Sequence, residues 1–180
     1  MSEDFSPPSR RILERMRLFV LVAAALAFTS VASGGGGQVV RAHGVEATVP
    51  AGWERVASAG DGQVIDPRTL LVLGTVGVTA KPSQCQIAAY RIPPTGAVVV
   101  IVGWRTAAAG RGTPKPGRAP LKKLIALRAH SAECFAGRAA AAQVHLGGRL
   151  YQVNVMVGDS ASSKRIAEAL AVSRSFRLVP

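Results

Sequence analysis

Few side chains in this sequence have the types and spacings suited to catalysis. The carboxylates that follow residue 32 are Glu46, Glu54, Asp61, Asp66, Glu133, Asp159 and Glu168. None of them forms the close pair that glycoside hydrolysis uses, and no G-x-S-x-G motif marks a serine hydrolase. The sequence therefore predicts a protein that is not an enzyme and has no catalytic residue. The alternative is an enzyme whose pocket forms around His145, with Glu133 or Glu168 brought near it by folding.

Cys85 and Cys134 are the only two cysteines of the chain. In an exported protein, two thiols predict a single disulfide bond. Two free buried thiols, or a redox or metal role, are the alternatives, and no C-x-x-C motif supports redox chemistry. We expect a Cys85–Cys134 disulfide.

His130, Glu133 and Cys134 lie close together in sequence, and His43 or His145 could complete a metal site with them. Structural zinc sites favour paired ligands at C-x₂₋₄-C or H-x₃₋₅-H spacing, which this chain lacks. A cysteine in a disulfide also cannot bind a metal. The sequence predicts neither a metal nor a cofactor.

A segment rich in Gly and Pro carries positive charge without nearby acids. Its cations are Arg111, Lys115, Arg118, Lys122 and Lys123. The whole chain has a formal net charge of +12, which favours polyanionic partners. We expect the segment to be an exposed loop that binds an anionic polymer or lipid head groups, the alternative being a solvated loop. Because the basic residues are scattered and not interleaved with aromatic ones, no nucleic acid is expected.

A polar face is the second candidate binding surface, and it depends on a predicted hairpin. Alternating apolar residues on both sides of Gly147-Gly148 predict two strands joined by a tight turn. This pairing sets Val144 opposite Tyr151 and Ala142 opposite Val153. The other face then carries Gln143, His145, Gln152 and Asn154. The alternative is that this polar face is only the solvent-exposed side of a sheet and binds nothing.

The N-terminal segment resembles a secretory signal. The apolar run LFVLVAAALAF, residues 18–28, follows Arg15 and Arg17 and precedes small residues, with Ala32 at a plausible cleavage site. The run is short for a membrane-spanning helix, so membrane attachment is expected only if the signal stays uncleaved. Translation starting at Met16 is a further alternative. We expect a secreted or extracytoplasmic protein of the cell envelope.

We expect the chain to consist of a signal peptide (1–32), a flexible linker (33–43) that includes four consecutive glycines, and one globular domain (44–180). A hydrophobic content of 48% excludes a disordered chain. Other expected strands cover residues 45–49, 70–79, 86–92, 97–104 and 175–179, with a further element starting at Trp53. A helix is expected over residues 161–173, and residues 121–127 fit a short helix or a strand.

Two terminal segments resemble PsbP-type domains. They are GVEATVPAGWERV at residues 44–56 and GGRLYQVNVMVGD…AEALAVSRSF near the C-terminus. The resemblance implies the Mog1/PsbP-like fold of the α+β class, an antiparallel sheet between helices in an α/β/α sandwich, as in exported bacterial proteins. It also implies a docking or accessory role. We therefore expect an exported, non-enzymatic binding domain that contacts a protein or an anionic component of the cell envelope.

Overall fold

The computed structural model describes residues 37–59, 66–105, 117–118, 128–129, 132, 134–146 and 149–179. Its strands are β1 (Gln38–Ala42), β2 (Val45–Val49), β3 (Trp53–Arg55), β4 (Arg68–Thr75), β5 (Thr79–Ala80), β6 (Tyr90–Arg91), β7 (Ala97–Gly103), β8 (Gly117–Arg118), β9 (Arg128–Ala129), β10 (Arg138–Leu146), β11 (Arg149–Val157) and β12 (Arg177–Leu178). The helix of this described part is α2 (Ser163–Arg174).

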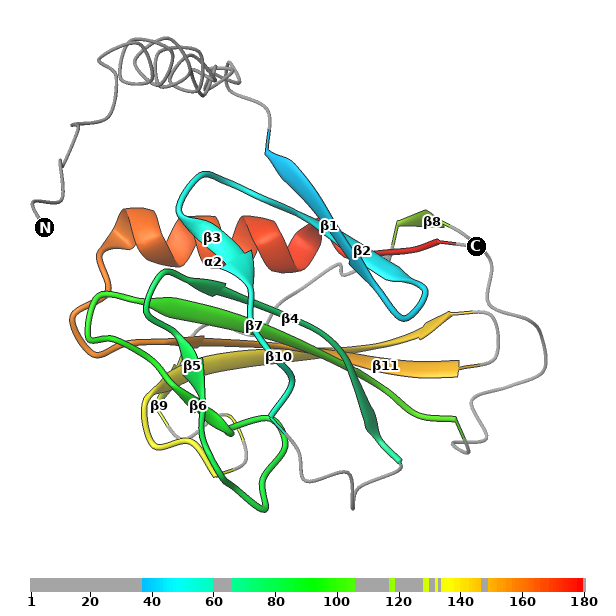
Figure 1. Ribbon diagram of the computed structural model, residues 1–180, viewed down its shortest axis with the longest axis horizontal. Helices are drawn as coiled ribbons and strands as arrows, with labels where there is room; N and C mark the ends of the chain where they lie inside the picture. The colour runs from blue at the N-terminus through cyan, green and yellow to red at the C-terminus, as the bar shows by residue number, and fades with distance from the viewer. Residues whose placement is uncertain are drawn as a thin grey trace, which may run out of the picture. The chain divides into compact units, whose positions relative to one another are not determined.

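A six-stranded antiparallel sheet, the central sheet, has the strand order β3-β4-β7-β11-β10-β9 (Figure 1). Every residue of β7 is buried, which fits its run of β-branched side chains with no polar face. β4 and β11 flank β7 and are largely buried as well. Layers therefore cover the middle of the central sheet on both faces.

The second sheet has the order β1-β2-β12-β8. β1 and β2 form a hairpin whose two-residue turn consists of His43 and Gly44, with positive φ angles of 48° and 75°. Positive φ at both central residues is typical of the type I′ turn, whose twist matches that of the paired strands. The turn places His43 at the tip of this hairpin.

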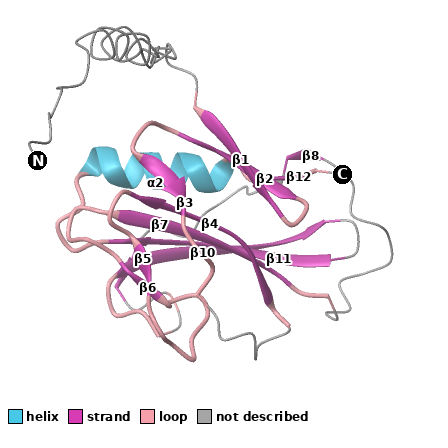
Figure 2. Ribbon diagram, in the orientation of Figure 1, coloured by secondary structure: helices cyan, strands magenta, loops and turns pink. Residues whose placement is uncertain are grey.

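α2 lies along the same side of the central sheet as the second sheet (Figure 2). The hydroxyl of Ser162 caps the helix by accepting a hydrogen bond from the backbone N–H of Arg165 at 3.2 Å. Ala169 and Val172 on the helix and Phe176 after it are buried in the apolar cluster between these layers. On the opposite face, a second cluster includes Tyr90 and lies beneath the two-stranded β5–β6 sheet.

The expected α/β/α sandwich is wrong. Strands account for 50% of the described residues and helix for 11%, in three sheets with one described helix. The physical reason is that residues 38–49 and 177–178 pair into a second sheet beside α2. The other face of the central sheet carries β5, β6 and their loops, so the described layers are mostly β.

Two local expectations also differ from the structure. Residues 38–42, expected in a flexible linker, form β1 because their backbone pairs with β2. Residues 86–92, expected as a strand paired across a turn with residues 97–104, contribute only the two residues of β6, which pair with β5. Residues 121–127 lie outside the described residues.

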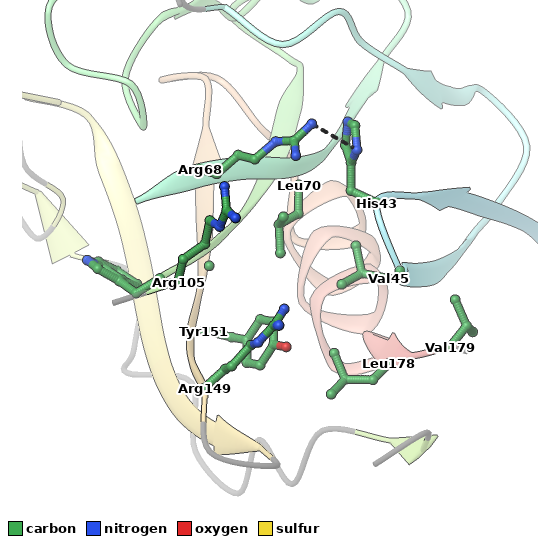
Figure 3. A pocket seen from close by; sticks show the side chains of 12 residues that line it. His43, Val45, Arg68, Leu70, Arg105, Arg149, Tyr151, Leu178 and Val179 are labelled. Carbon is green, nitrogen blue, oxygen red and sulfur yellow. Dashed lines mark hydrogen bonds between the residues drawn. The ribbon is translucent and has the colours of Figure 1, made fainter. Parts of the chain in front are cut away.

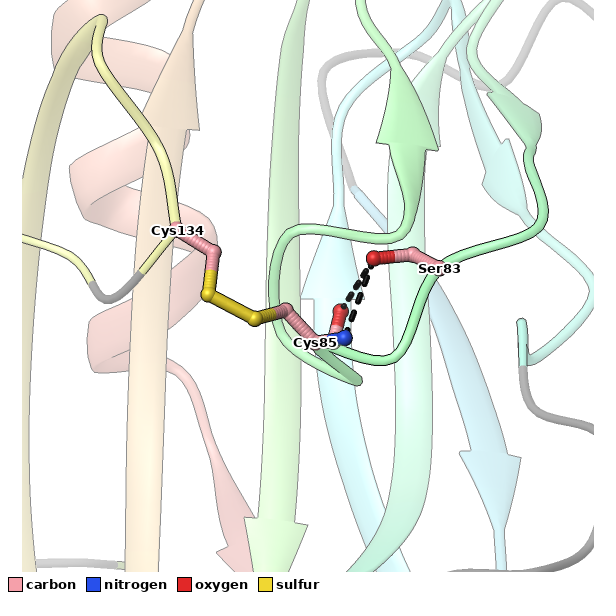
Figure 4. The surroundings of a disulfide bond; sticks show 3 residues. All are labelled: Ser83, Cys85 and Cys134. Carbon is pink, nitrogen blue, oxygen red and sulfur yellow. Dashed lines mark hydrogen bonds between the residues drawn. A yellow bond between two sulfur atoms is a disulfide. The ribbon is translucent and has the colours of Figure 1, made fainter.

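The predicted C-terminal hairpin and the predicted disulfide are confirmed. β10 pairs with β11 with Val144 opposite Tyr151 and Ala142 opposite Val153. Cys85 and Cys134 are joined by a disulfide, with their Cα atoms 6.3 Å apart (Figure 4). The bond connects the loop between β5 and β6 to the segment before β10, and Ser83 accepts a hydrogen bond from the Cys85 backbone N–H at 3.0 Å.

Candidate functional site

A cleft of about 500 Å³ lies between the second sheet and one end of the central sheet (Figure 3). The described residues that line it are His43, Gly44, Val45, Arg68, Leu70, Gly103, Trp104, Arg105, Arg149, Tyr151, Leu178 and Val179. Its volume is within the range of small-molecule sites, roughly 300–1,000 Å³. Its lining combines three arginines and a histidine with apolar side chains.

The antiparallel strand order brings the three arginines together. Arg68 begins β4, Arg149 begins β11, and Arg105 follows the end of β7. Since β4 and β11 both run antiparallel to the β7 strand between them, their first residues lie at the end where β7 finishes. The register confirms this, because Gly103 of β7 is opposite both Arg68 and Tyr151.

His43 reaches the cleft from the tip of the β1–β2 hairpin. Its Nδ1 lies 3.2 Å from a terminal guanidinium nitrogen of Arg68 (Figure 3). Since a guanidinium only donates hydrogen bonds, this contact requires Nδ1 to be the unprotonated ring nitrogen. Burial lowers the pKa of His43 below its usual value, and the positive charges of Arg68 and Arg55 lower it further. Burial and the neighbouring cations therefore both favour the neutral imidazole.

Arg149 and Tyr151 form a second polar pair on the opposite wall. Both side chains line the cleft, and the Arg149 guanidinium is near enough to the Tyr151 hydroxyl for its charge to act on the pKa of that hydroxyl. Burial raises the pKa of Tyr151, while the charge of Arg149 partly offsets this rise. The hydroxyl therefore keeps its proton at neutral pH and can donate it in a hydrogen bond to an anion.

The charge of this cleft is positive. None of its described lining residues is a carboxylate. Asp66, near its edge, accepts a hydrogen bond from the backbone N–H of Arg105 at 2.8 Å. In the described part of the chain, ion pairs join Arg41 and Arg177 to Glu46 and Arg165 to Glu168. The guanidinium groups that line this cleft can bind a carboxylate or phosphate through paired hydrogen bonds.

The structure locates only part of the predicted polyanion-binding segment. Arg118 lies in β8, where its backbone is opposite Arg177 of β12. Gly117, the residue before it, is opposite Leu178, which lines the cleft. Arg111, Lys115, Lys122 and Lys123 lie outside the described residues, so binding by this segment stays a prediction.

The structure brings the predicted polar face together. Gln143 and Gln152 are opposite each other and share a hydrogen bond of 3.0 Å. Gln152 in turn donates to Asn154 at 2.7 Å, and Asn154 donates to the carbonyl of Val100 at 3.3 Å. His145 is exposed and follows Gln143 by two residues, on the same face of β10. These side-chain amides therefore form a chain of hydrogen bonds across the sheet.

This polar face and the cleft are on opposite sides of the central sheet. Val144 and Tyr151 belong to the apolar cluster under α2, so the adjacent His145 projects to the other side. Glu168 of α2 accepts a hydrogen bond from Trp53 in the cluster under α2. Glu168 and His145 therefore do not meet. Glu133 lies outside the described residues.

Sequence reasoning missed the cleft arginines and assigned His43 only to a possible metal site. The available signal was that Arg68, Arg105 and Arg149 each flank an apolar run that was expected to form a strand. The convergence of these three arginines can be predicted only if the strand order is known, and no local sequence pattern indicates that order.

No protein-family model matches this chain, and no curated protein is significantly similar to it in sequence. Within the described part of the chain, no three His, Cys, Asp or Glu residues gather as metal ligands would. In the same residues, no helix has the length and hydrophobicity needed to cross a membrane.

Proposed function

We propose that this protein is an extracytoplasmic binding protein, without catalytic activity, that holds an anionic ligand in the cleft between its two larger sheets. The observation that carries the proposal is the convergence of Arg68, Arg105 and Arg149 on a cleft with no carboxylate among its described lining residues. Each guanidinium offers a fork of N–H donors that fits a carboxylate or phosphate group.

One further observation supports this assignment. The disulfide between Cys85 and Cys134 is compatible with an extracytoplasmic location, where the signal-like segment would direct the chain. An accessory role is also what the resemblance of the terminal segments to PsbP-type domains implies, and that resemblance stays a prediction. The partner in this proposal is an anionic component of the cell envelope.

The alternative of an enzyme with a pocket around His145 has no specific observation in its favour. His145 is exposed on the polar face, and the described cleft residues do not include it.

The test is a titration with small anions followed by ¹⁵N–¹H NMR. Sulfate and acetate should shift the backbone resonances of Gly44, Gly103 and Arg149, which line the cleft. The triple variant Arg68→Gln, Arg105→Gln, Arg149→Gln should lose at least tenfold in sulfate affinity, because hydrogen bonds to charged groups contribute roughly 1.5–3 kcal/mol each.

A matched control removes the same charge elsewhere. Lys81→Gln, Arg91→Gln, Lys164→Gln changes three cations that are not among the lining residues of the cleft. This control should bind sulfate nearly as well as the parent, with a small loss from the weaker overall field. Equal losses in the two triple variants would show that binding reflects net charge and not this site.

A further inference from the structure

The floor of the cleft is apolar and continues into the core. Val45, Tyr151 and Leu178 line the cleft and belong to the buried cluster between the central sheet, α2 and the second sheet. Leu70 also lines the cleft and packs against this cluster. A ligand group that passes the arginines therefore contacts hydrocarbon.

Gly103 shapes the middle of this floor. A Cβ atom at this position would lie 2.8 Å from Cδ1 of Leu70 and 3.3 Å from Cδ1 of Tyr151. The missing side chain thus lets Leu70 and Tyr151 pack close over the end of β7. Their side chains, with Leu178 on the facing sheet, form an apolar surface next to the positive rim (Figure 3).

A purely polar anion would leave the partly exposed apolar side chains of the cleft, Leu70, Trp104 and Val179, in contact with water. An apolar chain on the ligand would cover them, and burying apolar surface is favourable by roughly 25 cal/mol per Å². The arrangement of charge outside and hydrocarbon inside matches a molecule with one anionic end and one apolar end. Charge complementarity fixes which end lies at the arginines.

We propose that the ligand of the cleft is a lipid anion, with a single carboxylate or phosphate head group on an unbranched apolar chain. The head group binds Arg68, Arg105 and Arg149, and the chain lies over Leu70 and Tyr151. This inference rests on the proposed function of anion binding and adds the chemical class of the ligand.

The experiment measures how affinity depends on chain length at a constant head group. The full chain is titrated with acetate, octanoate and dodecanoate below their micelle concentrations, by isothermal titration calorimetry. Each methylene that reaches the floor should raise the affinity about fourfold, which corresponds to about 0.8 kcal/mol per buried CH₂. Dodecyl phosphate replaces dodecanoate in a parallel arm and shows which head group the arginines prefer.

Variants of the floor separate the cleft from the apolar run at residues 18–28, which can bind lipid by itself. Leu70→Ser and Gly103→Ala should each reduce the dodecanoate-to-acetate affinity ratio at least tenfold. The matched control is Val39→Ser, which changes an apolar side chain that is 43% exposed on β1 and does not line the cleft. Its ratio should equal that of the parent protein. Circular dichroism melting checks that each variant is folded.

The outcomes distinguish the two proposals. If acetate and dodecanoate bind equally well, the lipid inference is overturned while anion binding stands. If dodecanoate binding persists unchanged in both floor variants, the chain lies elsewhere and the inference is again overturned. If no anion binds the cleft at all, both proposals fail.

Discussion

His43 is the side chain through which pH should act on the cleft. Burial and the charges of Arg68 and Arg55 lower its pKa below the usual 6.5. The folded protein therefore binds this proton more weakly than the unfolded chain does, so protonation of His43 costs stability as the pH falls below 6.5. An anion bound beside His43 would act in the opposite direction and raise that pKa.

We expect sulfate, which stays ionised over this range, to bind more tightly as the pH falls from 8 to 5.5. Protonated His43 loses its hydrogen bond from Arg68 and adds a positive charge beside the bound sulfate. An exposed ion pair between this imidazolium and sulfate should raise the sulfate affinity on the order of twofold to fivefold. The measurement is NMR titration of the parent and of His43→Gln, in which the dependence should disappear. His145→Gln is the control, and a dependence lost there instead would contradict the assignment.

Within the second sheet, one buried carboxylate joins three strands. Glu46 of β2 is only 4% exposed and lies opposite Arg41 of β1 and Arg177 of β12. It accepts a hydrogen bond from Arg41 at 2.5 Å and forms an ion pair with Arg177 at 2.8 Å. Because this sheet supplies His43, Val45 and Leu178 to the cleft, the cross-strand pairs also hold one cleft wall in place.

Glu46→Ala should lower the free energy of unfolding by about 1–3 kcal/mol, because it leaves two cations facing each other without their shared acceptor. Urea denaturation measures the change. Glu54→Ala removes an exposed carboxylate of β3 and should stay within about 0.5 kcal/mol of the parent. Sulfate affinity should fall in Glu46→Ala and not in Glu54→Ala. A similar stability for both variants would mean that the pairs add nothing to the sheet.

The layers that cover the two faces of the central sheet are held to it by different interactions. α2 and the second sheet cover one face through a continuous apolar cluster. The other face is covered by β5, β6 and their loops, and the Cys85–Cys134 bond ties these loops to the segment before β10. The disulfide restrains the side of the protein with little regular structure.

Replacing both cysteines with Ser should lower the free energy of unfolding by about 4 kcal/mol in the chain-entropy model. Thermal or urea denaturation tests this, and reduction of the parent with dithiothreitol should give the same loss. Because the disulfide and the cleft lie on opposite faces of the central sheet, sulfate affinity should persist in the folded fraction. A loss of stability near zero would show that the loops are held by packing alone.

Local patterns were sufficient for the C-terminal hairpin, the helix after it and the disulfide. Alternation at Ala142 and Val144 specifies which side chains share a face, and a one-residue slip would expose them all. An exported chain with only two cysteines can form only one intramolecular disulfide. The hairpin and the helix depend on residues close in sequence, and the disulfide has only one possible pairing.

The second sheet and the cleft could not be predicted in the same way. β12 pairs with β2 across more than a hundred residues of chain, and nothing local indicates that pairing. Arg68, Arg105 and Arg149 come from separate segments and meet only because β4, β7 and β11 are adjacent and antiparallel. Strand order results from the burial of all strands together, so the position of the charged site depends on long-range packing and not on any neighbouring residue.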